Sequence, residues 1–93
     1  MVRQDYRSHV GVILTILEVI DDYQGAGVTE ITRDANLPYS RAKTYLQRME
    51  EEGYLDRHTQ GRKKPYELTK KGKEFLKTLK RAEPFFESLG FPL

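Results

Sequence analysis

The sequence predicts a mainly α-helical (α+β) fold in which a helix, a turn and a helix are followed by a two-stranded hairpin and a C-terminal helix. Three observations predict it. Apolar residues recur at helical spacing over 10–20, 31–35 and 42–49. Two short alternating segments then flank a turn that contains Gly61 and three consecutive cations, as in a β-hairpin. Finally, apolar residues repeat at spacings of 4 and 3 over 68–89, the pattern of a helix that packs along one side.

The 93 residues are expected to form a single domain over 1–93, with a core over 8–68 and the C-terminal helix over 69–89. A chain of this length buries only about 60–65% of its unfolded surface, so oligomerisation is a reasonable expectation. The absence of cysteine excludes disulfides and thiolate zinc sites. His9 and His58 lie in different elements without carboxylates at metal-ligand spacing, so neither a metal nor a cofactor is expected.

The apolar run Val10–Ile20 does not resemble a signal peptide and is too short to span a bilayer. It is interrupted by Gly11, Thr15 and Glu18, and no small-residue cleavage motif follows it. We therefore expect no membrane segment and a cytoplasmic protein.

Charge is unevenly distributed along the chain. The net charge is only +2, but residues 57–73 hold seven Lys or Arg and one acid, Glu67, which leaves the remainder of the chain at −4. A basic segment on a mildly acidic body favours docking of a polyanion on one face, although a solvated charged surface is the simpler alternative.

The first helix is expected to run from an N-cap at Ser8 to about Tyr23. One apolar stripe at helical spacing faces the core and consists of Val10, Ile13, Leu14, Leu17 and Ile20. A second stripe, Val12, Ile16 and Val19, also has to be covered. The second stripe could be covered by the C-terminal helix or by a second subunit, or the whole helix could be buried in the core.

A Gly-rich turn at 25–27 separates the first helix from the second. We expect Val28 to begin a very short extended piece and Thr29 to be the N-cap of the second helix. That helix ends at Asn36, a residue tolerant of the left-handed cap, and Leu37 anchors the turn.

The third helix is expected to begin at Pro38 or Tyr39 and to end before Gly53, which suits the position after the C-cap. Its buried face carries Ala42, Tyr45, Leu46 and Met49. The opposite face consists of small hydrogen-bonding groups and cations, namely Ser40, Lys43, Thr44, Gln47 and Arg48, with Arg41 at its edge and Tyr39 at its tip. No acid precedes Glu50, which indicates a surface for a polyanion.

The hairpin and the last helix complete the domain. Strands are expected up to about His58 and again over 65–68. Thr69 caps the final helix, whose apolar positions at heptad spacing are Leu68, Gly72, Phe75, Leu79, Ala82, Phe86 and Leu89. Because a proline inside a helix costs about 3 kcal/mol, we expect a break or kink near Ala82–Glu83, with Pro84 opening a short terminal helix.

Two strings in this chain are characteristic of a family. Glu52-Gly53-Tyr54-Leu55 after the third helix, and Tyr66-Glu67-Leu68-Thr69-Lys70-Lys71-Gly72 before the last, resemble the small archaeal winged helix-turn-helix DNA-binding proteins. The resemblance covers about residues 10 to 82. It implies a two-stranded wing and a C-terminal helix that forms an antiparallel coiled coil between two subunits.

The predicted function is that of a sequence-specific transcriptional regulator that binds double-stranded DNA as a homodimer. In this prediction, contacts of the third helix in the major groove come from Tyr39, Ser40, Arg41, Lys43, Thr44, Gln47 and Arg48. Wing contacts to phosphates or to the adjacent minor groove come from Arg57, Arg62, Lys63 and Lys64. Dimer contacts come from Val12, Ile16, Val19, Phe75, Leu79, Ala82, Phe86 and Leu89.

Other functions remain open at the level of sequence. The nearest is a weakly specific architectural protein of the nucleoid, and a second is a winged helix used for protein contacts. An enzyme is not expected, because the sequence places no recognisable catalytic combination of an acid, a base and a nucleophile on one helix or strand. A small-molecule effector is open, but an aromatic stripe at heptad spacing is more often core than ligand site.

Overall fold

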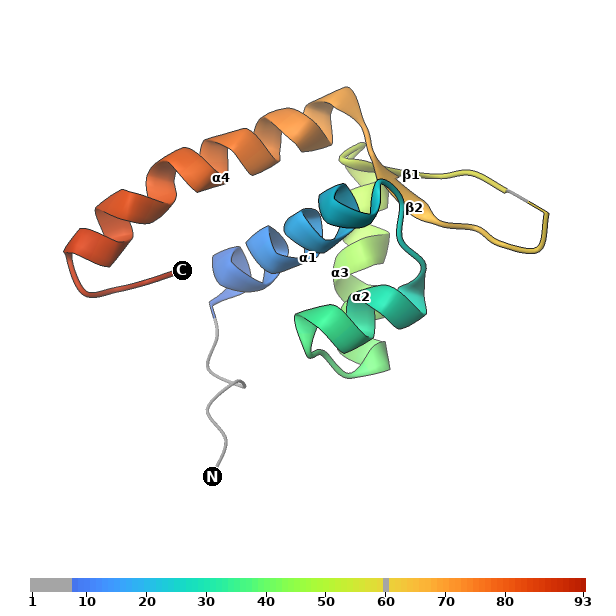
Figure 1. The fold of residues 1–93 in the computed structure, drawn as a ribbon, viewed down its shortest axis with the longest axis horizontal. Coiled ribbons are helices and arrows are strands. Elements are labelled where there is room, and N and C mark those ends of the chain that lie inside the picture. Colours follow the sequence, from blue (N-terminus) through green and yellow to red (C-terminus); the bar gives the residue numbers. More distant parts are fainter. Residues whose placement is uncertain (1–7, 60) are drawn as a thin grey trace.

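A computed structural model describes residues 8–59 and 61–93 and contains the six expected elements in the expected order (Figure 1). The elements are α1 (His9–Tyr23), α2 (Val28–Ala35), α3 (Tyr39–Glu51), β1 (Leu55–Arg57), β2 (Tyr66–Leu68) and α4 (Lys70–Ser88). β1 and β2 form one antiparallel sheet, and with the turn between them they make up the wing. The predicted mainly helical fold with a two-stranded wing is confirmed.

Helix α1 is the centre of the core. Ser8 caps it as predicted, since its hydroxyl accepts a hydrogen bond from the Gly11 amide at 2.9 Å. α2, β2 and α4 all pack against this helix. The assignment of Val12, Ile16 and Val19 to a dimer interface is wrong, because these side chains are 0%, 0% and 8% exposed within the single chain. Within the single chain, α2, β2 and α4 cover this helix, while Val10 at its start remains 41% exposed.

The helix-turn-helix consists of α2 and α3. α2 begins two residues earlier than expected, with Gly27 as its N-cap instead of Thr29, because the Glu30 carboxylate accepts a hydrogen bond from the Gly27 amide at 2.8 Å. The extended residue is therefore Ala26, not Val28. Its amide and carbonyl both bond to Tyr66 of β2, at 3.0 and 2.8 Å. Leu37, 6% exposed, anchors the turn to the core as predicted.

A tight corner joins the end of α3 to the start of α4. The Thr69 hydroxyl accepts from the Gly72 amide at 3.0 Å and donates to the Gly53 carbonyl at 2.6 Å. The Thr69 amide also donates to the Tyr54 carbonyl at 3.2 Å. Gly72 is required here, because a Cβ at this position would overlap the Tyr54 carbonyl oxygen. The two sequence segments that resemble the family, 52–55 and 66–72, therefore contact each other at this corner.

Lysine and aromatic groups reinforce this corner. The Lys71 ammonium donates to the Glu52 carbonyl at 2.7 Å and lies 4.5 Å from the centre of the Tyr54 ring. The same ring packs against Phe75, with centroids 4.8 Å apart. The C-terminal end of α3 is consequently bound to the first two turns of α4.

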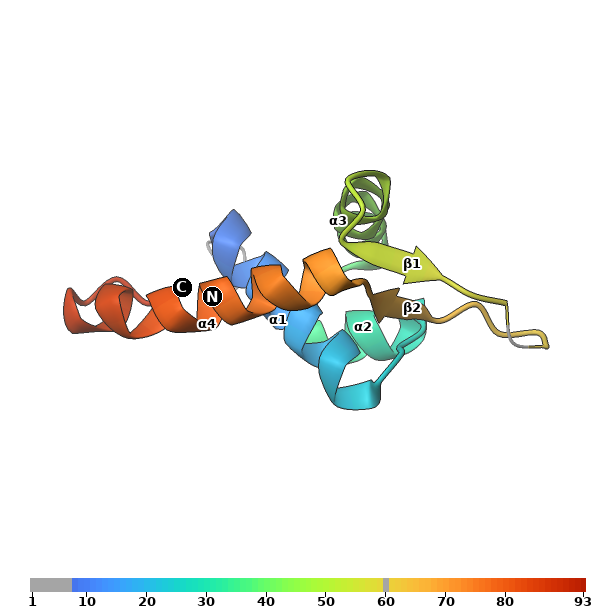
Figure 2. The ribbon, with the colours of Figure 1, turned by 90° about the horizontal axis from the view of Figure 1, so that it is seen from above.

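Helix α4 is packed at its beginning and exposed at its end. Gly72 and Leu76 are buried, Phe75 and Leu79 are half-buried against the core, and beyond Ala82 the helix extends away from the body (Figure 2). The expected break near Ala82–Glu83 does not occur, since one helix continues through Pro84 to Ser88. Pro84 and Lys80, whose carbonyl would otherwise accept the missing amide, are both exposed, so water can replace the lost hydrogen bond.

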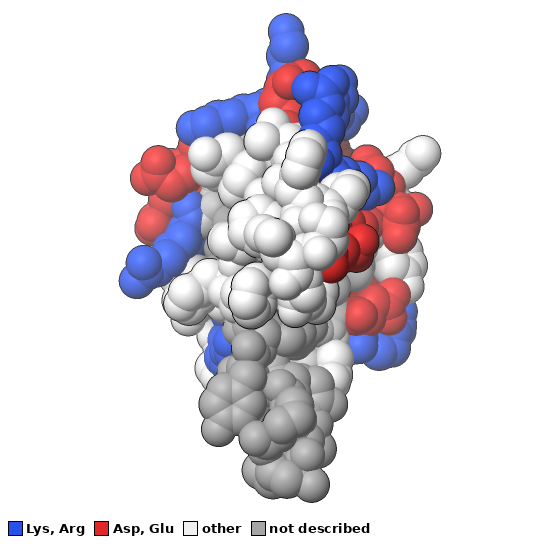
Figure 3. All heavy atoms as spheres, turned by 90° about the vertical axis from the view of Figure 1, so that its left-hand side faces the viewer, with Lys and Arg blue, Asp and Glu red and all other residues white. Residues whose placement is uncertain are grey.

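The end of α4 and the residues after it present an uncharged surface. Phe85, Phe86, Leu89 and Phe91 are 72%, 42%, 69% and 70% exposed. Figure 3 shows this end of the molecule, with uncharged side chains across its middle and charged ones around the margin. Leu93 instead returns to α1, where its backbone lies so close to Gly11 that a Cβ there would be 2.7 Å from it. We call the four exposed residues the apolar end.

No helix within residues 8–59 and 61–93 is long and apolar enough to cross a membrane.

Candidate nucleic-acid interface

The exposed face of α3 is formed by the residues that the sequence singled out. Tyr39, Ser40, Thr44, Gln47 and Arg48 are exposed, and Tyr39 at the tip is 64% exposed. Ala42, Leu46 and Met49 fix this orientation because they are buried on the opposite side. Tyr45, which was expected in the core, is only half-buried. At 100° per residue, Ser40, Thr44 and Gln47 lie along the centre of the exposed face.

The cations of α3 lie on the two flanks of that centre. Arg41 and Arg48 are on the flank that faces α1, where they line a groove together with His9 and Ile13. Lys43 lies on the other flank and is half-buried. The structure therefore divides the predicted recognition residues into a central row of neutral polar side chains and two cationic edges.

The wing presents its cations at the tip. Arg62, Lys63 and Lys64 are exposed there. Arg57 is also exposed, but its guanidinium is already engaged: Nε donates to the Lys64 carbonyl at 3.1 Å, and the group lies 4.5 Å from the centre of the Tyr66 ring. Arg57 therefore fixes the return of the hairpin, a structural role that the sequence did not indicate, because this residue was predicted only to contact DNA.

The base of the wing carries an opposing pair of acids. Asp56 and Glu67 are directly opposite in the strand register, and His58 Nε2 lies 4.0 Å from the first carboxylate and 3.9 Å from the second. Like charges in this arrangement repel, and a protonated His58 offsets the repulsion. Sequence reasoning missed this group, because it becomes visible only once the register is known. The described residues contain no group of side chains suited to a metal ion.

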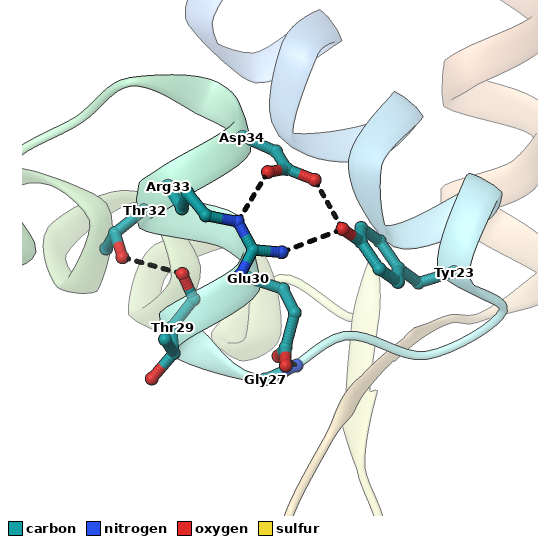
Figure 4. Close-up of polar contacts among 7 residues, drawn as sticks. All are labelled: Tyr23, Gly27, Thr29, Glu30, Thr32, Arg33 and Asp34. Atoms are coloured by element: carbon teal, nitrogen blue, oxygen red, sulfur yellow. Dashed lines mark hydrogen bonds and ion pairs between the residues drawn. The ribbon is translucent and has the colours of Figure 1, made fainter.

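A cluster of three polar side chains holds α2 against the end of α1 (Figure 4). The Tyr23 hydroxyl donates to Asp34 Oδ2 at 2.5 Å and accepts from Arg33 Nη2 at 2.9 Å. Arg33 Nε also pairs with Asp34 Oδ1 at 2.9 Å. The hydrogen bond from Tyr23, and then that from Arg33, lowers the pKa of Asp34. The cluster positions α2, which in turn carries α3.

Replacing Tyr23 with Phe should raise the pKa of Asp34 toward its ordinary value, because it removes the strongest hydrogen bond to the carboxylate. Since folding lowers this pKa, the wild-type cluster stabilises the fold above about pH 4, and its contribution is lost as the pH falls through the folded-state value. NMR titration of the Asp34 carboxyl carbon measures the change. Tyr39→Phe, at an exposed tyrosine on α3, is the control. An unchanged Asp34 titration in Tyr23→Phe would contradict the assignment.

The chain is similar to a known protein family and to several solved structures. A family profile described as winged helix-turn-helix matches residues 6–85. A search of curated protein sequences finds no match. Among solved structures, Sso10a-2, a DNA-binding protein from Sulfolobus solfataricus, aligns with a TM-score of 0.80 and 26% identity over 89% of this chain and 85% of its own.

Two further structures are similar over shorter parts of their own length. A MarR family protein from Bacillus stearothermophilus gives a TM-score of 0.71 at 20% identity, over 91% of this chain and 61% of its own. A transcriptional regulator from Thermotoga maritima gives 0.67 at 26% identity, over 84% and 57%. The chain thus spans most of the Sulfolobus protein and little more than half of the other two.

Proposed function

Because the chain belongs to the winged helix-turn-helix family, we propose that it is a transcriptional regulator that binds double-stranded DNA in a sequence-specific manner as a homodimer. α3 enters the major groove, and the wing follows the phosphate backbone. The main support for this proposal is the composition of the exposed face of α3. It offers hydrogen-bond donors and cations over three turns, and its first carboxylate is Glu50.

The chemistry of this face suits the edges of base pairs. Gln47 can bond to adenine through two hydrogen bonds, and each such pair contributes about 1–3 kcal/mol of discrimination. Ser40 and Thr44 are short, so the helix can approach closely; the Thr44 hydroxyl donates to the Ser40 carbonyl at 3.1 Å and offers its oxygen as an acceptor. We expect the exposed wing cations Arg62, Lys63 and Lys64 to add affinity with little sequence information, because contacts to phosphates do not depend on the bases.

The similar proteins support a regulator over an enzyme. The Sulfolobus protein is named as DNA-binding, and the protein from Thermotoga maritima is named as a transcriptional regulator. The described residues contain no metal cluster, and the proposal needs none. A cytoplasmic protein associated with the nucleoid follows from this function.

The apolar end supports the homodimer. Its four large side chains remain exposed although they could bury about 150–250 Å² per aromatic residue. A second copy of the same surface would cover them, and a two-fold interface of this kind pairs each patch with itself. Phe86 and Leu89 were predicted for this interface, whereas Phe85 and Phe91 were not. In such a dimer, the recognition helices would address half-sites about 34 Å apart or a multiple of that distance.

Selection of bound sequences from a random pool of DNA duplexes tests the proposal. The expected result is a two-fold symmetric consensus whose half-sites are separated by one helical turn or a multiple of it, and a Gln47→Ala protein should select a different consensus. Retention of DNA without any consensus would replace specific regulation with an architectural role. No retention at moderate salt would refute DNA binding altogether and favour a winged helix used for protein contacts.

Replacing Leu89 with Asp should convert the dimer to a monomer of 10.9 kDa, because it places a charge in the proposed interface. Leu89 is 69% exposed in the single chain, so the monomer fold should be unaffected. Sedimentation equilibrium measures the mass, and circular dichroism checks the fold. Ser88→Asp is the matched control, since it adds the same charge at the neighbouring exposed position. A wild-type protein that sediments as a monomer at every concentration would contradict the dimer.

A further inference from the structure

A groove between the first turn of α1 and the flank of α3 has no role in the function described so far. Its volume is about 610 Å³, and α1 contributes His9 and Ile13 to its lining. Along the long axis of the molecule, α3 lies between this end of α1 and the wing (Figures 1 and 2). The groove therefore borders the recognition helix on the side away from the wing.

The rim of the groove is built from donors. Arg41 and Arg48 lie one above the other on α3, seven residues apart, and Ser40 and Thr44 add hydroxyls beside them. No carboxylate lines the groove. The floor consists of Ile13, Tyr45 and Met49, so a ligand with an anionic group and an apolar body fits it.

A hydrogen bond between two distant residues fixes the α1 side of the rim. The Tyr45 hydroxyl lies 2.8 Å from Nδ1 of His9, and the two rings are 6.0 Å apart. When the hydroxyl donates to Nδ1, the ring proton resides on Nε2, and His9 keeps one donor that Tyr45 does not use.

We propose that this groove seats one phosphodiester of the DNA backbone, held by Arg41, Arg48 and the Nε2 donor of His9. The deoxyribose next to it packs on the apolar floor. This inference rests on the proposed function and deepens it in two ways. DNA is held on both sides of α3, by the wing on one and by α1 on the other. Arg41 and Arg48 then position the backbone, and base reading is left to Ser40, Thr44 and Gln47.

The test compares Arg41→Gln and His9→Gln with Gln47→Ala, using the full-length protein. Affinity is measured for the selected duplex and for a scrambled duplex over a range of salt concentrations, and phosphate ethylation interference maps the backbone contacts. Arg41→Gln should lower affinity for both duplexes by the same factor, roughly tenfold, and make the log–log salt slope less steep by at most about 1.8 for a dimer, because Arg48 still contacts the same phosphate. His9→Gln should weaken interference at the same phosphate. Gln47→Ala should keep that interference and change the selected bases.

Two results would overturn the inference while leaving the proposed function intact. One is a change in the bases selected by Arg41→Gln, which would make Arg41 a base reader. The other is an interference pattern in His9→Gln identical to that of the wild type. A wild-type protein that retains no DNA would refute the proposed function itself, before any variant is compared. His9 is exposed and Arg41 half-buried, and thermal unfolding of each variant confirms that it is folded.

Discussion

Replacing Gly72 with Ala should lower the free energy of unfolding by about 2 kcal/mol or more, because the added Cβ overlaps the Tyr54 carbonyl oxygen. Helix propensity alone predicts the opposite sign, since Gly to Ala inside a helix normally stabilises by about 1 kcal/mol. For a domain of this size, the destabilisation corresponds to a fall in Tm of roughly 10 °C. Urea titration and thermal unfolding measure it.

The direction of the stability change in Gly72→Ala distinguishes the steric overlap from helix propensity, because the two predict opposite signs. Lys73→Ala is the matched control, because it changes the next, exposed position of the same helical turn and should leave the stability within about 0.5 kcal/mol of the wild type. A Gly72→Ala protein that is as stable as the wild type or more so would show that α4 does not approach Tyr54 as closely as described.

Replacing Arg62, Lys63 and Lys64 together with Ala should weaken binding to every duplex by about a hundredfold or more at physiological salt. If each cation contacts one phosphate, a dimer loses six contacts, and the log–log salt slope becomes less steep by roughly 5. The ratio of affinities for selected and scrambled duplexes should not change, because backbone contacts carry no base information. Fluorescence anisotropy at several salt concentrations measures both quantities.

A second triple variant controls for net charge. Lys77, Lys80 and Arg81 are exposed on α4, and replacing them with Ala removes the same three charges away from the wing. This variant should keep nearly the wild-type slope. Equal losses in the two variants would show that the total charge of the protein, and not the position of the wing, determines affinity.

Local signals in the sequence predicted much of this fold. Ser8 and Thr69 are caps, Gly53 follows α3 with a φ of +84°, and the apolar period of α3 identified its buried side. These signals act within a few residues, so they can be read without the tertiary structure. Thr29 failed as a cap because the Glu30 side chain reaches back to Gly27 and begins the helix earlier.

What depends on distant contacts was not predictable from the sequence. Periodicity showed that Val12, Ile16 and Val19 are apolar, but not that the same chain buries them. The hydrogen bond between His9 and Tyr45 joins residues 36 positions apart, so no local sequence pattern predicts it. The engagement of Arg57 by the Lys64 carbonyl likewise depends on the hairpin geometry. The candidate site was therefore predicted as a set of residues, but its division into centre and flanks was not.

The corner at Thr69 and Gly72 has a mechanical consequence. Because the C-terminal end of α3 is tied to α4 through hydrogen bonds from Thr69 and Lys71, the proposed recognition helix and the helix that carries the apolar end should rotate together as one rigid unit. In a dimer joined at the apolar ends, the angle at which the two α4 helices cross then fixes the distance between the recognition helices. A change in that angle, far from the DNA, would be transmitted along α4 and would alter the half-site spacing that the protein accepts.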